Sequence, residues 1–389
     1  MSARNILLVI PRFYPKSGGG VNVVFNVAKF LKKNGENVTI LTTDFCFDEF
    51  FAQKLVFEGI EIIKIKTVFT FFSFIYSPEI DDWLQQNLMN YDIVHLNWTR
   101  AYQNNVIMKY ALKYNIPYVI QPHGSMTDVS SKKLMKRMYD LMWGKKLYSN
   151  ASKFIALTSS EKNTITSIIG DKDRTEIIPN GIDLKDYEDP VTVGEFRNKW
   201  NIGPKKKIIL YVGRIHESKG LDKLILSLSL ITSANPDILI VIAGADDHYL
   251  DKLEKMISVD KFENNVLITG YLSEKEKYQA FVDSDVFVTP KFFGFPITFI
   301  ESWFFGLPVV TTDVGDSIEW IDDYVGYSVK YNENALAESI MKIIENEDIR
   351  ERLSKNGKGL VRSRLNWEFI ITDIIKLYRK TIIETGRCE

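Results

Sequence analysis

Short apolar runs rich in Val and Ile alternate with longer segments of helical periodicity, and this alternation constrains the fold more than any other feature. The first series runs through NILLVI (5–10), a helical segment at 20–33, NVTILTT (37–43), DIVHL (92–96), PYVIQ (117–121) and KFIALT (153–158). Buried parallel strands joined by helices produce this pattern, because both faces of such a strand are covered. The sequence therefore predicts an α/β domain.

The alternation starts again in the second half of the chain. Its strands are expected at KKIILYVG (206–213), ILIVIAG (238–244), NVLITG (265–270), DVFVTP (285–290) and LPVVTT (307–312). A length of 389 residues also favours two cores over one. We predict an N-terminal domain over 1–184 and a C-terminal domain over 185–365, with the charged, Pro- and Gly-containing stretch 184–205 as a linker.

Composition and charge exclude several classes of protein. The formal net charge is -1, which gives no general case for a nucleic-acid binder, although the first 180 residues are basic and the rest acidic. Cys46 and Cys388 are too few for a disulfide framework and fit a reducing cytosol. The apolar run Ile6 to Ile10 is too short for a secretory signal, and no segment approaches the ~20 apolar residues of a membrane span. We predict a cytoplasmic protein, either soluble or at the inner face of the membrane.

Three glycines, Gly18, Gly19 and Gly20, stand between the first strand and the first helix. Such a turn exposes backbone N–H groups and the positive end of the helix dipole, which together bind phosphate. A dinucleotide fingerprint would require a third spaced glycine where Val23 stands, although Asp44 is placed like a ribose-binding acid. An NAD-dependent oxidoreductase is therefore a weak alternative, and a glycine turn without a ligand is another.

Arg214 and Lys219 follow the first strand of the second series and precede a helix. The carboxyl end of a strand in an open α/β sheet is where ligands bind, and two cations there can hold a diphosphate. Spacing alone does not distinguish this site from a solvated loop.

Five segments in fixed order make a more specific pattern. They are IIPNGID (177–183), YVGRIHESKG (211–220), VIAGADD (241–247), ITGYLSEKEKYQAFVDSDVFVTP (268–290) and FGFPITFIESWFFGLPVVTTDVGDSIEWI (293–321). In these motifs the chain resembles the retaining glycosyltransferases of family 4. The resemblance implies the GT-B fold: two facing Rossmann-like α/β domains, with the C-terminal helix at 366–389 crossing back to complete the first domain.

The resemblance also implies roles for individual residues. Arg214 and Lys219 would neutralise the diphosphate of a nucleotide sugar and stabilise the leaving group, and His123 would lie near the donor sugar. Glu301 would accept hydrogen bonds from the ribose hydroxyls, and the glycine loop would contact the phosphates. The implied catalytic residues are His123, Arg214 and Lys219, and the implied donor-binding residues are Gly18, Gly19, Gly20, Asn180, Gly213, Tyr271, Leu272, Gly294, Phe295 and Glu301. His95 is better interpreted as packing or as a wall of the acceptor site.

One position departs from the family pattern. The family has two glutamates separated by seven residues, and counting back from Glu301 gives Phe293. A catalytically degenerate protein that binds a nucleotide sugar or a partner is therefore an alternative. Asp283 and Asp285 have the spacing of a metal motif, but Arg214 and Lys219 already supply positive charge, so we expect no metal and no cofactor.

Two apolar segments of the first half suggest the acceptor. Segment 130–153 combines Lys and Arg with Leu, Met and Trp and reads as a basic amphipathic helix, and VFTFFSFIY (68–76) would be an exposed apolar patch if it is a loop. A solvated helix face and a buried strand or dimer contact are the alternatives. We expect a hexosyltransferase that uses a UDP- or GDP-sugar, acts on a saccharide or lipid-linked acceptor in cell-surface polysaccharide or glycan synthesis, and contacts anionic membrane through these segments.

Overall fold

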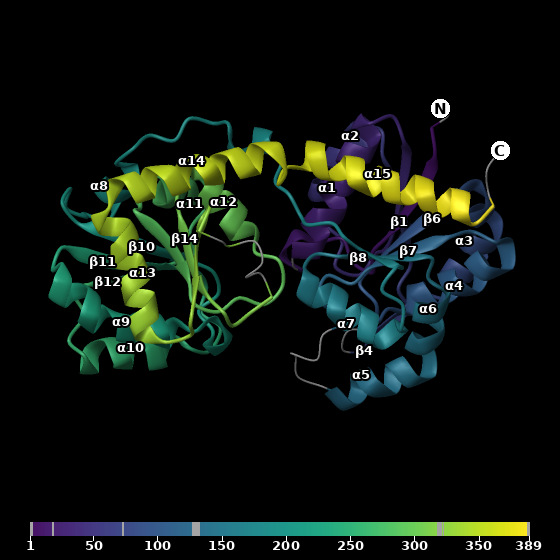
Figure 1. Cartoon of the computed structure of the whole chain (residues 1–389). Helices are drawn as coiled ribbons and strands as arrows, with labels where there is room; N and C mark the ends of the chain where they lie inside the picture. Colours follow the sequence, from purple (N-terminus) through teal and green to yellow (C-terminus); the bar gives the residue numbers. More distant parts are fainter. Residues whose placement is uncertain are drawn as a thin grey trace. The chain divides into compact units, whose positions relative to one another are not determined.

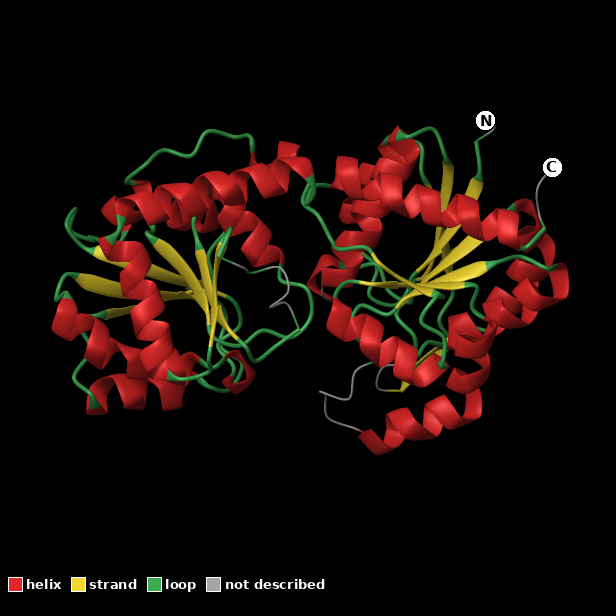
Figure 2. Cartoon of the chain, in the orientation of Figure 1, coloured by secondary structure: helices red, strands yellow, loops and turns green. Residues whose placement is uncertain are grey.

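The chain forms two compact units (Figure 1). The computed structural model describes residues 3–17, 19–71, 74–126, 133–316, 321 and 323–386. Unit 1 comprises Met1–Asn180 and Trp367–Glu389, and unit 2 comprises Gly181–Asn366. In each unit, helices cover a central sheet (Figure 2).

The sheet of unit 1 has the strand order β3-β2-β1-β6-β7-β8-β9, and all neighbouring strands run parallel. Most of the central strands are buried, as the continuous Val and Ile runs predict. The strands are β1 (Asn5–Val9), β2 (Asn37–Thr43), β3 (Glu61–Ile65), β6 (Ile93–Asn97), β7 (Tyr118–Gln121), β8 (Lys153–Ala156) and β9 (Thr175–Ile177).

Apart from α5, the helices of unit 1 contribute buried apolar residues to the two cores on this sheet. The last helix, α15, packs beside α1 in the same core, and Lys33 of α1 forms an ion pair with Glu368 of α15 at 2.5 Å. The predicted return of the C-terminal helix to the first domain is therefore confirmed. The helices are α1 (Gly19–Lys33), α2 (Glu49–Phe57), α3 (Glu79–Asn87), α4 (Tyr102–Tyr114), α5 (Lys133–Tyr139), α6 (Lys145–Asn150), α7 (Ser159–Ile169) and α15 (Trp367–Glu384).

The two apolar segments of unit 1 take different forms. Segment 68–76 is a short antiparallel hairpin of β4 (Phe69–Phe71) and β5 (Phe74–Tyr76), separate from the main sheet. Segment 133–150 is helical as predicted, but a π-helical turn at Asp140–Gly144 separates α5 from α6. The hairpin is thus neither the loop nor the buried strand that the sequence left open.

Unit 2 has a second parallel sheet, with the order β12-β11-β10-β13-β14-β15. Its strands are β10 (Lys207–Val212), β11 (Ile238–Ala243), β12 (Val266–Gly270), β13 (Val286–Thr289), β14 (Val309–Thr312) and β15 (Gly326–Val329). Its helices are α8 (Glu195–Lys199), α9 (Leu221–Ala234), α10 (Leu250–Val259), α11 (Glu274–Asp283), α12 (Ile297–Phe305), α13 (Glu333–Glu345) and α14 (Glu347–Ser363).

The interpretation of 184–205 as a linker is wrong. The stretch contains a 3-10 turn at Leu184–Tyr187 and helix α8, and it folds within unit 2. Phe196 is fully buried in the unit 2 core, and the carboxylate of Asp283 accepts hydrogen bonds from the backbone N–H groups of Gly194 and Arg197. Most of the charged residues that suggested a linker are exposed, whereas Glu195 and Arg197 are half-buried.

Within the described part of the chain, no helix is both long and apolar enough to cross a lipid bilayer.

Candidate active site

A cavity of about 150 Å³ lies in unit 2 at the carboxyl end of β10. Its walls come from the end of β10, the end of β13 and the first turn of α12. A helix N-terminus at the carboxyl edge of a parallel sheet attracts anions. The lining residues are Tyr211, Val212, Gly213, Arg214, Lys219, Thr289, Phe292, Ile297 and Thr298. The structure thus brings Gly213, Arg214 and Lys219 together.

Lys219 is a half-buried cation in this cavity. Burial, and then the charge of Arg214, lower the pKa of Lys219 to about 8. Its ammonium lies 4.3 Å from the centre of the Phe292 ring, and among the described residues no carboxylate pairs with it. A cation that is partly desolvated without a counter-ion is stabilised when an anion binds beside it.

Arg214 lies at the mouth of the cavity and is 66% exposed. Its guanidinium forms an ion pair with Asp247 at 2.5 Å. Exposed pairs of this kind contribute only about 0–1 kcal/mol, so a doubly charged ligand can compete with Asp247 for Arg214.

Close packing explains the glycine at the end of β10. A Cβ added at Gly213 would stand 2.7 Å from the Tyr211 hydroxyl. A Cβ added at Gly244, which follows the neighbouring strand, would stand only 1.8 Å from the backbone oxygen of Gly213. The Tyr211 hydroxyl in turn donates to the backbone oxygen of Arg214 at 2.8 Å. These contacts hold the segment that carries Arg214 against the neighbouring strand.

Glu301 lies on α12, one turn beyond the residues that line the cavity, and it is buried. Its Oε1 accepts hydrogen bonds from Lys277 at 2.6 Å and from the Tyr187 hydroxyl at 2.9 Å. Burial, followed by the charge of Glu301, raises the pKa of Tyr187, so this phenol stays protonated. Neither Lys277 nor Tyr187 was predicted from the sequence.

The remaining donor-side candidates of unit 2 lie outside the cavity wall. Tyr271 is 80% exposed after β12, while Leu272 is buried. The N–H of Gly294, which has a φ of 86°, donates to Asp316 at 3.0 Å. Phe295 is half-buried in the same segment.

Phe293 precedes this turn and is half-buried. The ammonium of Lys291 lies 5.6 Å from the centre of its ring. The position of the expected first glutamate is therefore occupied by an aromatic ring with a cation beside it.

His123 lies in unit 1, just after β7, with a φ of 51°. Burial lowers its pKa to about 3, so the imidazole is neutral at physiological pH. Its Nε2 lies 2.9 Å from Oδ1 of Asn97, at the end of β6, and donates to it in the Nε2–H tautomer. Nδ1 then remains as a hydrogen-bond acceptor.

Glu161 fixes the turn that carries His123. Its carboxylate accepts hydrogen bonds from the N–H of Gly124 at 2.7 Å and of Leu157 at 2.8 Å. Sequence reasoning missed both Glu161 and Asn97. The signal for Asn97 was a polar residue ending the apolar run DIVHLN, whereas Glu161 is too far along the chain from His123 for any pattern to link them.

Of the other predicted residues of unit 1, those that the structure describes lie at the start of a helix or are buried in the protein. Gly19 and Gly20 begin α1, where a Cβ at Gly20 would stand 3.0 Å from the Trp98 indole nitrogen, and Gly18 lies outside the described residues. Asn180 is buried, and its Oδ1 has no hydrogen-bond partner among the described residues. His95 packs in the core, with Nδ1 2.6 Å from the Tyr378 hydroxyl of α15.

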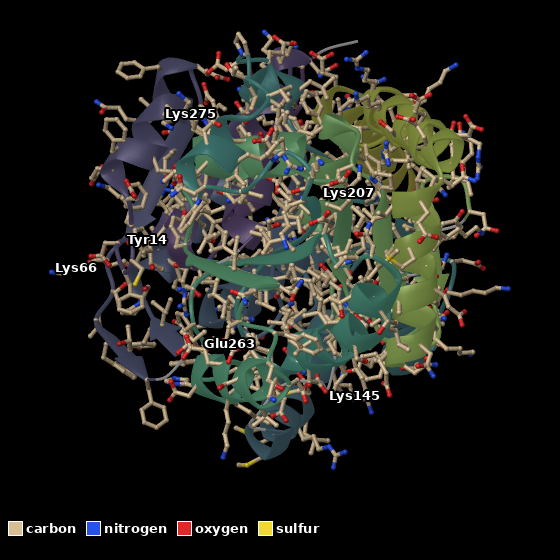
Figure 3. All side chains as sticks on the ribbon, turned by 90° about the vertical axis from the view of Figure 1, so that its left-hand side faces the viewer. Tyr14, Lys66, Lys145, Lys207, Glu263 and Lys275 are labelled. Carbon is tan, nitrogen blue, oxygen red and sulfur yellow. The ribbon has the colours of Figure 1, made fainter. Side chains whose placement is uncertain are left out.

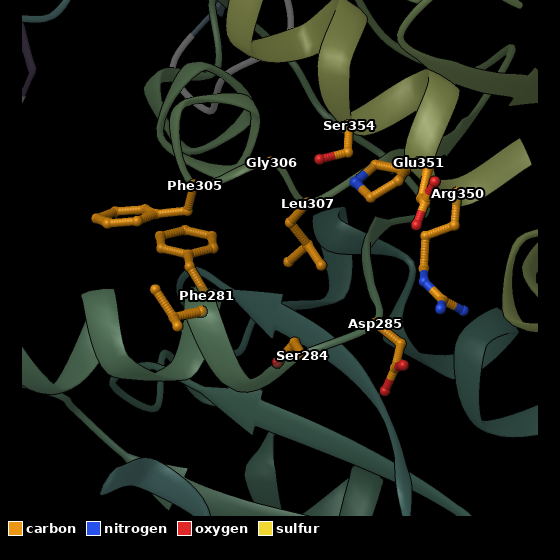
Figure 4. A pocket seen from close by; sticks show the side chains of 11 residues that line it. Phe281, Ser284, Asp285, Phe305, Gly306, Leu307, Arg350, Glu351 and Ser354 are labelled. Carbon is orange, nitrogen blue, oxygen red and sulfur yellow. The ribbon is translucent and has the colours of Figure 1, made fainter. Parts of the chain in front are cut away.

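A second cavity, of about 170 Å³, lies beside the segments that precede β13 and β14 (Figure 4). These are the amino ends of the strands, opposite to the edge that carries Lys219. Asp285 in its wall accepts hydrogen bonds from Lys207 (Figure 3) at 3.0 Å and from the N–H of Ile208 at 2.9 Å. With Asp283 bound to backbone N–H groups, both carboxylates of the metal-like motif are occupied by protein donors.

Both halves of the chain match known protein families. The family model described as glycosyl transferases group 1 matches residues 193–360, and the model described as glycosyltransferase family 4 matches residues 17–186. The chain belongs to these glycosyltransferases. This assignment favours sugar transfer over the oxidoreductase alternative.

Relatives of this glycosyltransferase agree with the assignment. An uncharacterized glycosyltransferase of Methanocaldococcus jannaschii is 23% identical, over 98% of this chain and 100% of the relative. The capsular polysaccharide biosynthesis glycosyltransferase CapM of Staphylococcus aureus is 26% identical, over 60% of this chain and 63% of the relative. The crystal structure of Anabaena HepE in complex with UDP and glucose superposes with a TM-score of 0.75 at 18% identity, over 97% of this chain and 100% of HepE. The predicted GT-B fold is confirmed.

Proposed function

We propose that this glycosyltransferase transfers a sugar, with retention, from a nucleotide sugar to a saccharide acceptor that is linked to a lipid. The observation that carries the proposal is Lys219, a partly buried cation at the carboxyl edge of the unit 2 sheet that has no counter-ion within the described part of the chain. A diphosphate fits this charge. HepE, which shares the fold, was crystallised with UDP and with UDP-glucose, and CapM acts in capsular polysaccharide synthesis.

The proposed chemistry requires charge stabilisation more than a protein base. The bond from the anomeric carbon to the diphosphate breaks, and the acceptor oxygen forms its bond to the same face of the sugar. The acceptor proton passes to the departing phosphate oxygen. Lys219, Arg214 and the N-terminus of α12 stabilise the charge that develops on this leaving group. We propose that no metal is needed, because these groups already supply the positive charge.

The resemblance gives other residues roles at the donor. We propose that Glu301 accepts from the ribose hydroxyls and that neutral His123 contacts the donor sugar through Nδ1. Gly19, Gly20, Asn180, Gly213, Tyr271, Leu272, Gly294 and Phe295 complete the proposed donor-binding set, together with Gly18.

A screen of UDP-, GDP- and ADP-sugars by saturation-transfer NMR, followed by donor hydrolysis assays with and without EDTA, tests this proposal. We expect one donor class to bind and to be hydrolysed slowly, without loss of activity in EDTA. Lys219→Met should weaken donor binding by about tenfold or more, because a charge-assisted hydrogen bond is lost. Lys252→Met, at an exposed lysine of the same unit, is the matched control. Unchanged affinity in Lys219→Met would contradict the proposal.

The same assay distinguishes an active enzyme from the catalytically degenerate protein that the replacement of the first glutamate by Phe293 suggests. A wild-type chain that binds a donor but transfers no sugar to any saccharide or lipid-linked acceptor would support that alternative. In an active enzyme, Phe293→Glu should change donor preference or rate if this side chain contacts the sugar.

The proposed lipid contact rests on an apolar surface of unit 1 that we call the aromatic patch. Its side chains are at least 44% exposed. The patch consists of Val68, Phe69 and Phe71 near the hairpin and Met138, Leu141, Met142 and Trp143 near the π-helical turn. Exposed Arg137, Lys145 (Figure 3) and Lys146 flank its helical part in the sequence.

Both parts of the aromatic patch attach to the start of α4. The ring of Tyr102 packs against Phe74 and Tyr76 of the hairpin, at 5.9 and 5.0 Å between ring centres. Tyr139 of α5 donates to the backbone oxygen of Ala101 at 3.0 Å. Basic side chains beside exposed aromatic and aliphatic groups fit an anionic lipid surface, and we propose the cytoplasmic face of a membrane.

Flotation with phosphatidylcholine vesicles, with and without phosphatidylglycerol, tests the membrane proposal. We expect binding only to the anionic vesicles. Replacing both Leu141 and Met142 by Glu should lower binding by about tenfold or more, since burying each apolar side chain contributes about 1.5–3 kcal/mol. Met89→Glu, at a 63% exposed methionine elsewhere in unit 1, is the control. Equal binding by all three proteins would refute the patch as the lipid contact.

A further inference from the structure

Glu301 is a buried carboxylate whose two oxygens have different surroundings. Oε1 is occupied, because it accepts from Lys277 at 2.6 Å and from Tyr187 at 2.9 Å. Oε2 has no hydrogen bond to the described residues. One oxygen of Glu301 is therefore held by the protein and the other is open to a ligand.

Lys277 forms an ion pair with this carboxylate, with 2.6 Å between Nζ and Oε1. The side chain of Glu301 is 5% exposed and that of Lys277 is 19% exposed. Burying a carboxylate so far from water is costly unless an opposite charge lies beside it. The Lys277 ammonium is that charge, and removing it would leave a lone charge in the interior.

The neighbouring titratable groups cannot replace Lys277. Tyr187 and Tyr278 pack against each other, with ring centres 5.0 Å apart, and burial raises the pKa of both phenols. Asp186 and Glu274 lie close enough to raise the pKa of Tyr278 further. Among these neighbours Lys277 is the cation, and the others are neutral or negative.

Glu301, which carries the open oxygen, lies on α12 about one turn after the residues of this helix that line the cavity. Ile297 and Thr298 of the first helical turn line the cavity that holds Lys219. Residues three and four positions further along a helix share its face, which places Glu301 on the same side as both. A ligand with its phosphates beside Lys219 can therefore present its next polar groups to Glu301.

We infer that Lys277 and Tyr187 are positioning residues for the donor: they hold the Glu301 carboxylate in place through Oε1 and leave Oε2 to accept hydrogen bonds from the hydroxyls of the nucleoside. This inference rests on the proposed function, because it assigns the ligand as a ribonucleoside diphosphate. Neither residue touches the ligand in this arrangement. Both act through the Glu301 carboxylate.

Discrimination between ribose and deoxyribose tests the inference, because a merely structural role for Lys277 would not change it. Binding of UDP, GDP and ADP and of their 2′-deoxy and 3′-deoxy analogues is measured by calorimetry. We expect the wild-type chain to prefer one ribonucleotide over at least one deoxy analogue by about tenfold or more, since a buried acceptor would lose its partner. In Lys277→Met this preference should fall close to one, whereas Lys277→Arg should retain most of it.

Two further variants make the result unambiguous. Lys275→Met is the matched control, because Lys275 lies on the same helix and is exposed (Figure 3). Tyr187→Phe removes a single hydroxyl and should lower the preference for the ribonucleotide. This variant provides the test if Lys277→Met does not fold. An unchanged preference in folded Lys277→Met overturns the inference alone. A wild-type chain that binds none of the nucleotides overturns the proposed function as well, so the two failures are distinguishable.

Discussion

Lys219 should make donor binding depend on pH in a direction that its surroundings determine. Burial and Arg214 lower the pKa of Lys219 to about 8, so the ammonium is present below that pH and is lost above it. If a diphosphate binds the charged form, as we propose, its affinity should fall as pH rises through about 8, by up to about tenfold per pH unit.

Titration calorimetry from about pH 7 to pH 10 measures this effect. Lys219→Arg should abolish the decline, because a guanidinium stays protonated over this range. Lys252→Arg should leave the decline unchanged. A flat profile in the wild-type chain would mean that the charge of Lys219 does not contribute to binding.

The residues of the site were predictable from sequence only where they lie close together along the chain. Arg214 and Lys219 follow one strand, so the carboxyl edge of the sheet brings them together. Lys277 and Tyr187 lie 24 and 114 positions from Glu301, and no spacing rule connects such residues. Tertiary packing alone determines that Glu301 is buried and therefore needs a counter-charge.

At the scale of elements, Asp283 joins two helices. It is the last residue of α11, and its carboxylate accepts from the N–H groups of Gly194 and Arg197 at the start of α8, at 2.6 and 3.1 Å. Asp283→Ala would leave these buried donors unpaired, and we expect a loss of about 3 kcal/mol in the stability of unit 2.

Differential scanning calorimetry checks this prediction. Glu254→Ala, at an exposed acid of α10, should change stability little. If Asp283 instead held a metal ion, EDTA would destabilise the wild-type chain by as much as the substitution does. We expect no effect of EDTA.

Elements were predictable from sequence where the apolar period was regular. The long Val and Ile runs predicted β1, β2, β6, β7, β8 and β10 to β14, whereas the edge strands β3, β9 and β15 were not predicted. The hairpin at 68–76 was not predictable, because its two short strands pair with each other and leave Phe69 and Phe71 exposed. In 184–205 the single buried Phe196 could not outweigh the surrounding charges and prolines in a linear pattern.

At the scale of the whole molecule, acid should act on unit 1 through two histidines, the buried His95 and the half-buried His123. Burial lowers the pKa of His95 and of His123 to about 3, and the charge of His123 adds to the shift of His95. The unfolded chain binds these protons below about pH 6.5, so stability is lost as pH falls from there, by up to about 1.4 kcal/mol per pH unit for each histidine.

Hydrogen exchange measured by mass spectrometry at about pH 7 and pH 5.5 reports each unit separately. His95→Gln should reduce the acid sensitivity of unit 1, because one of the two titrating groups is gone. His248→Gln, at an exposed histidine of unit 2, is the control and should leave the acid sensitivity of unit 1 unchanged. Equal acid sensitivity of unit 1 in all three proteins would contradict the prediction.

The discontinuity of unit 1 has a consequence for how the protein is made. Its core contains Trp367, Ile371 and Tyr378 of α15, which emerge from the ribosome only after all of unit 2. Unit 2 is one uninterrupted stretch and can fold as soon as it is synthesised. The nascent sheet of unit 1 meanwhile has an apolar face uncovered. During translation the apolar residues of unit 1 that α15 covers therefore stay exposed until the last helix is synthesised.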